Sequence, residues 1–518
     1  MTTSPAAQLL GDLARDDIQL WLDGSSLRYR SPPHALTPGR KAAIQSLKSE
    51  LIELLRAQER APPRIEGAEA VWDPTEMQVG MIRNKSMPNL LVAFRWHGKL
   101  DLDVFPDALE LLQRRHAILR TRFIEDSSGR TWAVTEPRLR IDALIVDMRV
   151  ARDEAGSAEA VGSLRALNDS VFDLSTGAGL RAAVVIHTDE DSAFLFAAHH
   201  AVFDAFSTRI LIRDFSALYT ALVKGEAAEL PPLTVQYGDF AIAQHRLLEG
   251  AGGPRSLSYW RRALAGAKDI FRLPYDRHSP VGNTAQLPLV KSRLPDTVSD
   301  ALRAVAKQAQ STLYIAATAA LAVVIARWTH SRDVSFWISE HGRRRPELLE
   351  LIGCLISIWP IHLDLTRSPR FSETLRNVHT VYTSSLRHAH VPLGRLKPEL
   401  DRVRNGQVYP GLVFNFVPSN AFDWTREVAA PGDGHGLTGR FPADHFIAVR
   451  LTMIDSPGGL EWYFEHSSHM FEEATIERLS EDLARTLTEL SRGDDSAWMP
   501  VAATSSHSEI AARNTPTA

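Results

Sequence analysis

The stretch Phe194-Leu-Phe-Ala-Ala-His199-His200-Ala-Val-Phe-Asp204-Ala205 joins an apolar run of strand character to two adjacent histidines and, four residues later, an aspartate. Neighbouring side chains on an extended segment point to opposite faces, so His199 and His200 must lie in different environments. One imidazole can face a cavity while the other is held in the body of the protein. For an isolated pair of this kind, two structural histidines beside a buried aspartate are the favoured interpretation. The rest of the chain therefore has to decide between structure and chemistry.

The length and composition of the chain describe a soluble protein with more than one folding unit. Its 518 residues exceed what one ordinary core accommodates, and 44% hydrophobic with 23% charged residues is typical of globular proteins. The net charge of −4 is small for this length, which argues against nucleic-acid binding and against attraction to an anionic membrane. The single cysteine, Cys354, excludes an intramolecular disulfide and favours a reducing, cytoplasmic location.

Three further classes find no support in the sequence. Residues 1–5 lack the basic and apolar regions of a secretory signal. The longest apolar stretch, residues 313–328, is alanine-rich and short for a membrane span, so we predict a buried helix there. His187, His199 and His200 lie near one another, but no cysteine or glutamate completes a ligand pattern, so we predict no metal site.

Residues 1–60 have the pattern of a small domain made of a helix, a hairpin and a second helix. Residues 7–17 carry leucines at helical spacing, and residues 18–30 alternate around a turn at Gly24. A helix with a leucine stripe begins at Thr37-Pro38. Residues 61–70 contain two prolines and a glycine, and we predict that they form a linker.

This pattern resembles the tubulysin-type β-hairpin docking domains found at the N-termini of biosynthetic assembly-line proteins. The resemblance rests on Leu20-Trp-Leu-Asp-Gly, Leu27-Arg-Tyr-Arg and Leu36-Thr-Pro, followed by the leucine-rich helix. A two-stranded hairpin leaves one edge free to take an extended peptide as an added strand. The resemblance therefore predicts a docking edge for an acidic tail, formed by Leu27, Arg28, Tyr29 and Arg30. The alternative is an ordinary small domain whose arginines are merely solvated.

From Val71 onward the chain alternates helical and strand patterns in two successive α/β regions, residues 71–235 and 236–493. In the first region we expect helices at 103–120, 158–168 and 205–223, and strands at 141–150, 181–187 and 194–200. In the second we expect helices at 237–248, 257–265, 296–309, 312–328 and 472–492, and strands at 287–294, 334–338, 412–416, 445–453 and 460–465. Residues 494–518 are rich in Ser, Ala and Thr and are predicted to be a disordered tail.

Several stretches resemble, in the same order, the sequence elements of nonribosomal peptide synthetase condensation domains. The first are Pro74-Thr-Glu-Met-Gln78, Arg115-His-Ala-Ile-Leu-Arg-Thr-Arg-Phe123 and Phe172-Asp-Leu-Ser-Thr-Gly177. The catalytic signature His199-His200-x-x-x-Asp204 comes next, before Tyr237-Gly-Asp-Phe-Ala241, Tyr259-Trp260 and Leu273-Pro-Tyr-Asp-Arg277. Gly342-Arg343, Ile352-Gly353 and Phe414-Asn415-Phe416 complete the series. An ordered series of this kind is far more specific than the signature alone, and it covers residues 71–490.

The resemblance implies a fold and a set of site residues. It predicts an α/β fold with two chloramphenicol-acetyltransferase-like lobes in a V arrangement, preceded by the small α-β-hairpin-α docking domain. His200 would be the catalytic residue and would face a channel between the lobes. His199, Asp204 and Arg343 would be structural, with Arg343 compensating the buried charge of Asp204. Ser357 and Asn415 are candidates for lining the channel.

The chain departs from the family pattern at three places. Ala205 replaces the glycine that usually ends the signature, and Ala178-Gly179 replaces a Pro-Leu pair. Ser357 and His362 stand where an Asn and an Arg are common. None of these changes removes the histidines or Asp204, so we still expect activity. The changes after Gly353 put donor or acceptor preference in question rather than the chemistry.

Residue chemistry and resemblance together predict an acyl transfer. A histidine has a pKa near working pH and can take the proton of an attacking amine or hydroxyl, or orient that nucleophile. No Gly-x-Ser-x-Gly context surrounds a serine, so we do not expect a covalent acyl-enzyme. The resemblance predicts transfer of an acyl, peptidyl or polyketide chain from a carrier-protein phosphopantetheine thioester to a small-molecule amine or alcohol. The product would be an amide or an ester.

The expected partner is an acyl or peptidyl carrier protein with a short acidic C-terminal tail, recruited by the docking domain. That carrier brings the phosphopantetheine arm, and we expect this chain to bind no cofactor of its own and to be a monomer. No adenylation or carrier signature follows the condensation region, so the organisation resembles condensation enzymes that release a finished chain onto a free acceptor. Three alternatives stay open: an epimerisation domain, an acyltransferase that uses coenzyme A, and a non-catalytic module that recruits a carrier.

Overall fold

The computed structural model describes residues 5–493 except 17, 24–25, 60–61, 85–88, 151–153, 268–272, 278–287, 369, 397–410, 419–446 and 457. The chain divides into two compact units, Met1–Glu66 and Gly67–Ala518. The division falls within the predicted linker, residues 61–70. The predicted disordered tail, residues 494–518, lies outside the described residues.

The N-terminal unit packs helices against a β-hairpin. Its elements in chain order are α1 (Pro5–Arg15), β1 (Gln19–Asp23), β2 (Ser26–Arg30), α2 (Pro38–Ser46) and α3 (Lys48–Glu59). The two strands are antiparallel, with Leu20 opposite Tyr29 and Trp21 opposite Arg28. The small core of this unit is apolar throughout and includes Ala6, Leu13, Ile18, Leu20, Leu51 and Leu55.

The single helix predicted after Thr37 is in fact two helices. The hydroxyl of Thr37 accepts a hydrogen bond from the amide of Arg40 and so caps α2, which ends before Leu47. Helix α2 has no buried residue, whereas α3 places Leu51 and Leu55 in the core. One leucine stripe therefore continues across a break, and the stripe alone does not reveal that break.

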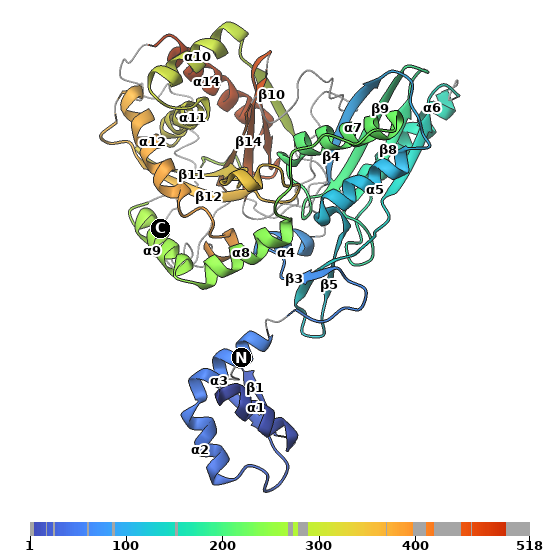
Figure 1. The fold of residues 1–518 in the computed structure, drawn as a ribbon. Helices are drawn as coiled ribbons and strands as arrows, with labels where there is room; N and C mark the ends of the chain where they lie inside the picture. The colour runs from blue at the N-terminus through green and yellow to red at the C-terminus, as the bar shows by residue number, and fades with distance from the viewer. Residues whose placement is uncertain are drawn as a thin grey trace. The chain divides into compact units, whose positions relative to one another are not determined.

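The larger unit begins with two sheets, which we call the first lobe. The strands β4 (Asn89–His97), β9 (Asp191–His199), β8 (Leu180–Ile186) and β7 (Asp142–Asp147) form one sheet in the order β4-β9-β8-β7. The smaller sheet has the order β3-β6-β5 and comprises β3 (Ala70–Trp72), β6 (Thr131–Thr135) and β5 (Thr121–Glu125). The helices of this lobe are α4 (Glu76–Arg83), α5 (Phe105–Arg115), α6 (Glu154–Asp169) and α7 (Ser207–Lys224) (Figure 1).

Strand β9 shows why the sequence before the two histidines is an unbroken apolar run. Phe194 and Phe196 pack into the main core of the first lobe, whereas Ala193 and Leu195 pack into a separate cluster on the other face. A strand buried on both faces has no solvent-facing positions, so its sequence does not alternate. Because β9 pairs with β4 on one side and β8 on the other, its end at His199 is held from both sides.

The second lobe is built on a mixed six-stranded sheet. Its order is β10 (Leu289–Arg293), β15 (Gly459–His466), β14 (Ile447–Ser456), β13 (Gly411–Val417), β11 (Asp333–Glu340) and β12 (Ser357–Asp364). One core joins this sheet to α10 (Asp296–Gln308), α11 (Leu313–Thr329), α12 (Phe371–Leu386) and α14 (Glu473–Ser491) (Figure 1). Helix α11 is buried along almost its whole length, which confirms the buried helix predicted over residues 313–328.

Membrane-spanning character is limited to one bent pair of helices among the described residues. No single helix in that part of the chain has the length and hydropathy of a span. Helices α10 and α11 meet both criteria only when they are taken together, and they are bent by 101° at the break between them.

Two segments carry the chain into the cores of both lobes. Helix α8 (Tyr237–Glu249) begins in the first-lobe core with Tyr237, and its Leu248 packs in the second-lobe core beside residues of α9 (Gly252–Leu264). Residues 351–355 connect β11 to β12 of the second lobe, and we call them the strap. The strap side chains that are buried in the first-lobe core are Leu351, Ile352, Cys354 and Leu355.

The strap requires glycine at one position. Gly353 has φ +152°, and a Cβ placed on it would lie 2.1 Å from Cδ2 of Tyr237. That distance is far shorter than a carbon–carbon contact, and the Tyr237 ring is fully buried, so it has little freedom to move away. The packing of α8 against the strap therefore depends on the missing side chain of Gly353.

We expect Gly353→Ala to lower the free energy of unfolding by about 2 kcal/mol or more, because the methyl group overlaps the Tyr237 ring and the backbone is strained. Gly162→Ala is the matched control, since Gly162 lies in α6 with no heavy atom within 4 Å of the added Cβ. Urea unfolding of the two variants beside the wild type measures the difference. Equal unfolding midpoints for all three proteins would contradict the close packing of the strap on Tyr237.

Candidate active site

Strand β9 ends at His199, whose ring is held within the first lobe. Its Nδ1 accepts a hydrogen bond from the amide of Ala201 at 3.1 Å, and the ring meets Phe172 edge to face. Burial lowers the pKa of His199 to about 4, and the neighbouring His200 acts in the same direction. A neutral, packed ring that accepts a backbone hydrogen bond has the surroundings of a scaffold residue, which is the role predicted for His199.

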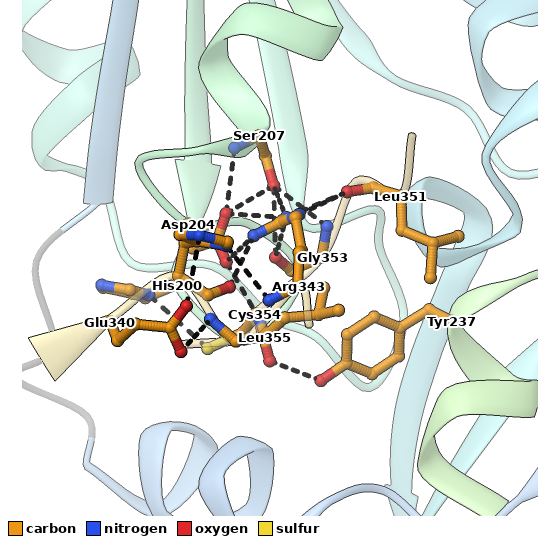
Figure 2. A network of polar contacts seen from close by, with 12 residues as sticks. His200, Asp204, Ser207, Tyr237, Glu340, Arg343, Leu351, Gly353, Cys354 and Leu355 are labelled. Carbon is orange, nitrogen blue, oxygen red and sulfur yellow. Dashed lines mark hydrogen bonds and ion pairs between the residues drawn. The ribbon is translucent and has the colours of Figure 1, made fainter. Parts of the chain in front are cut away.

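Asp204 and Arg343 form a buried, two-pronged ion pair (Figure 2). Nη1 of Arg343 lies 2.8 Å from Oδ2 of Asp204, and Nη2 lies 3.0 Å from Oδ1. The side chains are 0% and 3% exposed, respectively. Burial alone would raise the pKa of Asp204, but the charge and hydrogen bonds of Arg343 outweigh burial and lower it. The predicted pairing of these two residues is therefore present in the structure.

Other groups complete the shell around this ion pair. Ser207 donates its amide and its hydroxyl to Oδ1 of Asp204, at 2.9 and 2.7 Å, and the amide of Leu355 donates to Oδ2 at 3.0 Å. Nη2 of Arg343 also donates to the carbonyl of Leu351 at 2.9 Å. Figure 2 shows these contacts converging from the loop after β9, the segment after β11 and the strap. Because each charged group has several partners, both charges can persist in the interior.

His200 begins the loop after β9 and is 8% exposed. Burial lowers the pKa of His200, and the charge of Arg450 in β14 lowers it too, while the carbonyls of His200 and Phe203 and the charge of Asp204 oppose this shift. The net effect is an imidazole that is neutral at neutral pH and can accept a proton. Nδ1 lies 3.9 Å from the sulfur of Cys354 in the strap.

Asp204 does not act on His200 as the aspartate of a catalytic triad would. Within the described part of the chain, no hydrogen bond joins the carboxylate of Asp204 to the His200 ring, and both carboxylate oxygens are engaged elsewhere. In a triad the carboxylate bonds directly to the histidine and stabilises the imidazolium. Here the charge of Asp204 is offset by Arg343, so Asp204 and Arg343 shape the site rather than relay a proton.

The two predicted channel residues lie in the second-lobe sheet. Ser357 begins β12 opposite Glu340 of β11 and is half-buried. The amide of Asn415 in β13 accepts from the Ser339 hydroxyl and lies 3.5 Å from Oγ1 of Thr452. Across the residues that the structure describes, neither side chain makes a hydrogen bond to His200. Their role in lining a channel stays a prediction.

The predicted docking edge lies on β2 of the N-terminal unit. Leu27 is half-buried, whereas Arg28, Tyr29 and Arg30 are exposed. Tyr29 is 53% exposed, and Trp21, which faces Arg28 across the hairpin, is 43% exposed. Exposed aromatic side chains beside arginines are typical of protein-recognition surfaces. Trp21 was not among the predicted docking residues, although its place in the strand alternation indicates that it shares a face with Arg28.

Sequence reasoning missed three groups that shape the site. Ser207 follows Asp204 by three residues at the start of a helix, a spacing at which an aspartate commonly caps a backbone amide. The hydroxyl of Tyr237 donates to the carbonyl of Cys354 at 2.7 Å, a contact between residues 117 apart. Cys354 itself suggested only the redox compartment, because a lone cysteine has no spacing pattern to interpret.

The fold and the site define a class of protein. The condensation domain model matches residues 77–506, and the TubC N-terminal docking domain model matches residues 7–57. The chain belongs to the condensation domain family, the acyl- and peptidyl-transferring domains of nonribosomal peptide synthetases, and carries a docking domain before it. This membership confirms the predicted family, the predicted enzyme class and the predicted α/β fold with its docking domain.

Similar proteins include a far longer synthetase and excised domains of known structure. A linear gramicidin synthase of Brevibacillus parabrevis is 30% identical over 405 residues, which are 77% of this chain and 8% of that protein. The cyclization-docking bidomain of EpoB from Sorangium cellulosum has a TM-score of 0.66 at 20% identity, covering 94% of this chain and 99% of that one. The epimerization domain from the third module of tyrocidine synthetase B has a TM-score of 0.67 at 19% identity, covering 84% and 99%. The two solved structures share the fold with this chain.

We expect Asp204→Ala to lower the free energy of unfolding by about 3 to 5 kcal/mol, because it leaves the Arg343 charge buried without its partner. Because folding lowers the pKa of Asp204, the stabilisation is complete above the usual carboxyl pKa and disappears as the pH falls through the lowered value. Chemical unfolding at neutral and acidic pH should therefore show a gap between wild type and variant that closes only in acid.

The control for this experiment is Glu110→Ala, which removes a carboxylate that pairs with Arg114 at the surface of α5. We expect its unfolding midpoint to equal that of the wild type, since exposed pairs contribute little. An Asp204→Ala protein as stable as the Glu110→Ala protein would contradict the structural role of the buried ion pair.

Proposed function

We propose that this chain transfers an acyl or peptidyl chain from the phosphopantetheine thioester of a carrier protein to an amine or hydroxyl acceptor, with His200 as the catalytic residue. The observation that carries the proposal is a buried, neutral imidazole at the end of β9 in a chain of the condensation family. The nucleophilic atom of the acceptor attacks the thioester carbonyl, and its proton passes to His200. The carbon–sulfur bond then breaks, and the departing sulfur takes that proton. The product is an amide or an ester.

The contribution of His200 depends on the acceptor. A neutral amine is already a nucleophile, so orientation by the ring supplies much of the effect. A hydroxyl is a weak nucleophile and must lose its proton as it attacks, so it depends on general-base catalysis. The lowered pKa keeps the ring unprotonated at neutral pH, and activity should fall in acid as the ring is protonated.

We also propose that the docking domain recruits the donor carrier through a short acidic tail that adds to the edge of β2. Arg28 and Arg30 stand on this strand with their side chains exposed, and an edge strand offers backbone hydrogen bonds to an extended peptide. The two family matches are separated only by residues 58–76, a length too short for a folded carrier domain. This order supports delivery of the donor by another polypeptide.

The proposal extends to release of the acyl chain onto a free small-molecule acceptor, by a monomeric enzyme in the cytoplasm. A reducing compartment suits the buried thiol of Cys354. The phosphopantetheine arm would come with the carrier, and the chain's own residues would supply orientation and proton transfer. Products formed from amine and alcohol acceptors, offered free and carrier-bound, decide which acceptor is used.

We expect His200→Ala to slow transfer to a hydroxyl acceptor by about 10²- to 10⁴-fold, and transfer to an amine by less, since only the hydroxyl needs a base. The measurement loads the carrier with its acyl group, adds enzyme and acceptor, and follows both species by intact-mass spectrometry. His97→Ala is the control, because His97 is a largely exposed histidine at the end of β4.

Three results would each replace the proposal with one of its rivals. Transfer unchanged by His200→Ala, with carrier binding retained, identifies a recruiting module. Loss of deuterium from the donor α-carbon without transfer identifies an epimerisation domain, whose fold this chain shares. Coenzyme A thioesters that react as well as carrier-bound ones identify a free acyltransferase.

We expect the double variant Arg28→Glu with Arg30→Glu to raise the KM for the carrier by about tenfold or more, because it sets like charges against an acidic tail. The kcat at saturating carrier should stay unchanged, since the catalytic lobes are untouched. Deletion of residues 1–60 should act in the same way. Arg15→Glu in α1 is the control, an exposed arginine of the same unit. Equal KM values for all these proteins would contradict the proposed docking edge.

A further inference from the structure

The strap brings one side chain to the candidate catalytic histidine. Its neighbours in sequence are tied to the buried ion pair, since the amide of Gly353 donates to the Ser207 hydroxyl at 3.1 Å and the amide of Leu355 donates to Asp204. Cys354 lies between these two anchors, and its sulfur is 3.9 Å from Nδ1 of His200. The strap therefore links the ion pair to the imidazole, although the ion pair makes no direct hydrogen bond to that ring within the described residues.

The position of Cys354 is fixed from several sides. Its carbonyl accepts from the hydroxyl of Tyr237 at 2.7 Å, and its sulfur lies 3.4 Å from the sulfur of Met81 in α4. The residue is 2% exposed. Burial raises the pKa of the Cys354 thiol, so the sulfur stays protonated and adds no charge beside His200. Its effect on the ring is therefore one of packing and weak hydrogen bonding.

The other side of the histidine loop is held by the same elements. The side chain of Gln78 in α4 donates to the carbonyl of Ala201, next to His200, at 2.8 Å. Gln78 also accepts from the amide of Thr75, whose hydroxyl lies 3.5 Å from that of Tyr237. Contacts thus run from Ala201 through α4 and Tyr237 to Cys354, and enclose His200 between two fixed points. All of these side chains are buried.

We infer that Cys354 is a positioning residue for His200, and that the ion pair sets the orientation of the imidazole through the strap. This inference rests on the proposed function, because it assigns His200 the reacting ring. The ring turns about a broad torsion that has no sharp preferred value of its own, so a neighbour must define it. A displacement of about 1 Å in a reacting group costs about 10²-fold in rate, which gives a small contact at Nδ1 a large effect.

The groups that face His200 set the background for any change at position 354. They are His199 at the end of β9, Asp204 in the same loop, Arg450 from β14 and the carbonyls of His200 and Phe203. None of these groups is altered by a substitution of Cys354. A shift in the titration of His200 in such a variant therefore reports the contact between position 354 and the ring.

The test compares Cys354→Ala with Cys354→Ser under the carrier-dependent assay. Cys354→Ala leaves space beside the ring, and we expect kcat to fall about tenfold with the carrier KM unchanged. Cys354→Ser should restore kcat to within about threefold of the wild type. Its hydroxyl accepts a hydrogen bond from the charged ring more strongly than the thiol does, so the pKa of His200 rises. The acid limb of the pH–kcat profile should therefore move to higher pH.

Two further measurements separate positioning from folding and from the proposed function. Val323→Ala in α11 is the matched core variant, which should lose stability but keep the wild-type kcat. Nitrogen-15 spectra of histidine-labelled protein, with His200 assigned through His200→Ala, should show the His200 resonance moved by Cys354→Ala even where no transfer is measured.

The outcomes are distinct. Wild-type kcat, pH profile and His200 resonance in Cys354→Ala would overturn the inference and leave the proposed function standing. Transfer that is unaffected by His200→Ala would overturn the proposed function, and the spectra would then still decide whether Cys354 orients the ring. A fall in kcat for Val323→Ala equal to that of Cys354→Ala would assign the effect to lost stability and would also overturn the inference.

Discussion

The buried ion pair between Asp204 and Arg343 is the interaction on which the candidate site depends. It joins residues 139 positions apart and, through Ser207 and Leu355, it holds the loop after β9, the segment after β11 and the strap together. Removing two charges from water is costly, and their attraction alone often fails to compensate that cost. What the pair supplies is a single geometry, because the hydrogen bonds around it are satisfied only when all three segments are in place.

The same ion pair limits the chemistry available to His200. With its charge offset by Arg343, Asp204 stabilises the protonated ring only weakly, and burial and Arg450 keep the pKa of His200 low. A ring of this kind holds a proton only in passing, unlike the histidine of a triad, whose carboxylate partner stabilises the imidazolium. Such a base suits an acceptor that needs orientation and brief proton transfer, and it does not suit formation of a covalent acyl-enzyme.

The sequence predicts those parts of the structure whose burial is written into local patterns. The apolar run of β9, the alanine-rich helix α11 and the turn of the N-terminal hairpin each follow from residues close together in the chain. The ion pair follows from the family resemblance together with the rule that a buried carboxylate needs a partner. The break between α2 and α3 was not predicted, because one leucine stripe serves one helix or two equally well.

The strap escaped prediction for a different reason. Its role depends on contacts with Tyr237 and Ser207, which are more than a hundred residues away, and no local pattern records them. Gly353 looked like an ordinary family glycine until the Tyr237 ring was found where its side chain would stand. Cys354 carried information only about redox compartment, since a single cysteine has no partner with which to form a pattern.

The burial of the strap also constrains how substrates can reach His200. Leu351, Ile352 and Leu355 are 1 to 2% exposed in the first-lobe core, and burial of each such side chain contributes about 1.5 to 3 kcal/mol. Lifting the strap would forfeit this burial and would leave the ion pair without several of its partners. Thermal motion alone does not provide that much free energy with useful frequency. Access for a donor and an acceptor must therefore come from elements other than the strap, so that the support of the imidazole persists while substrates enter and leave.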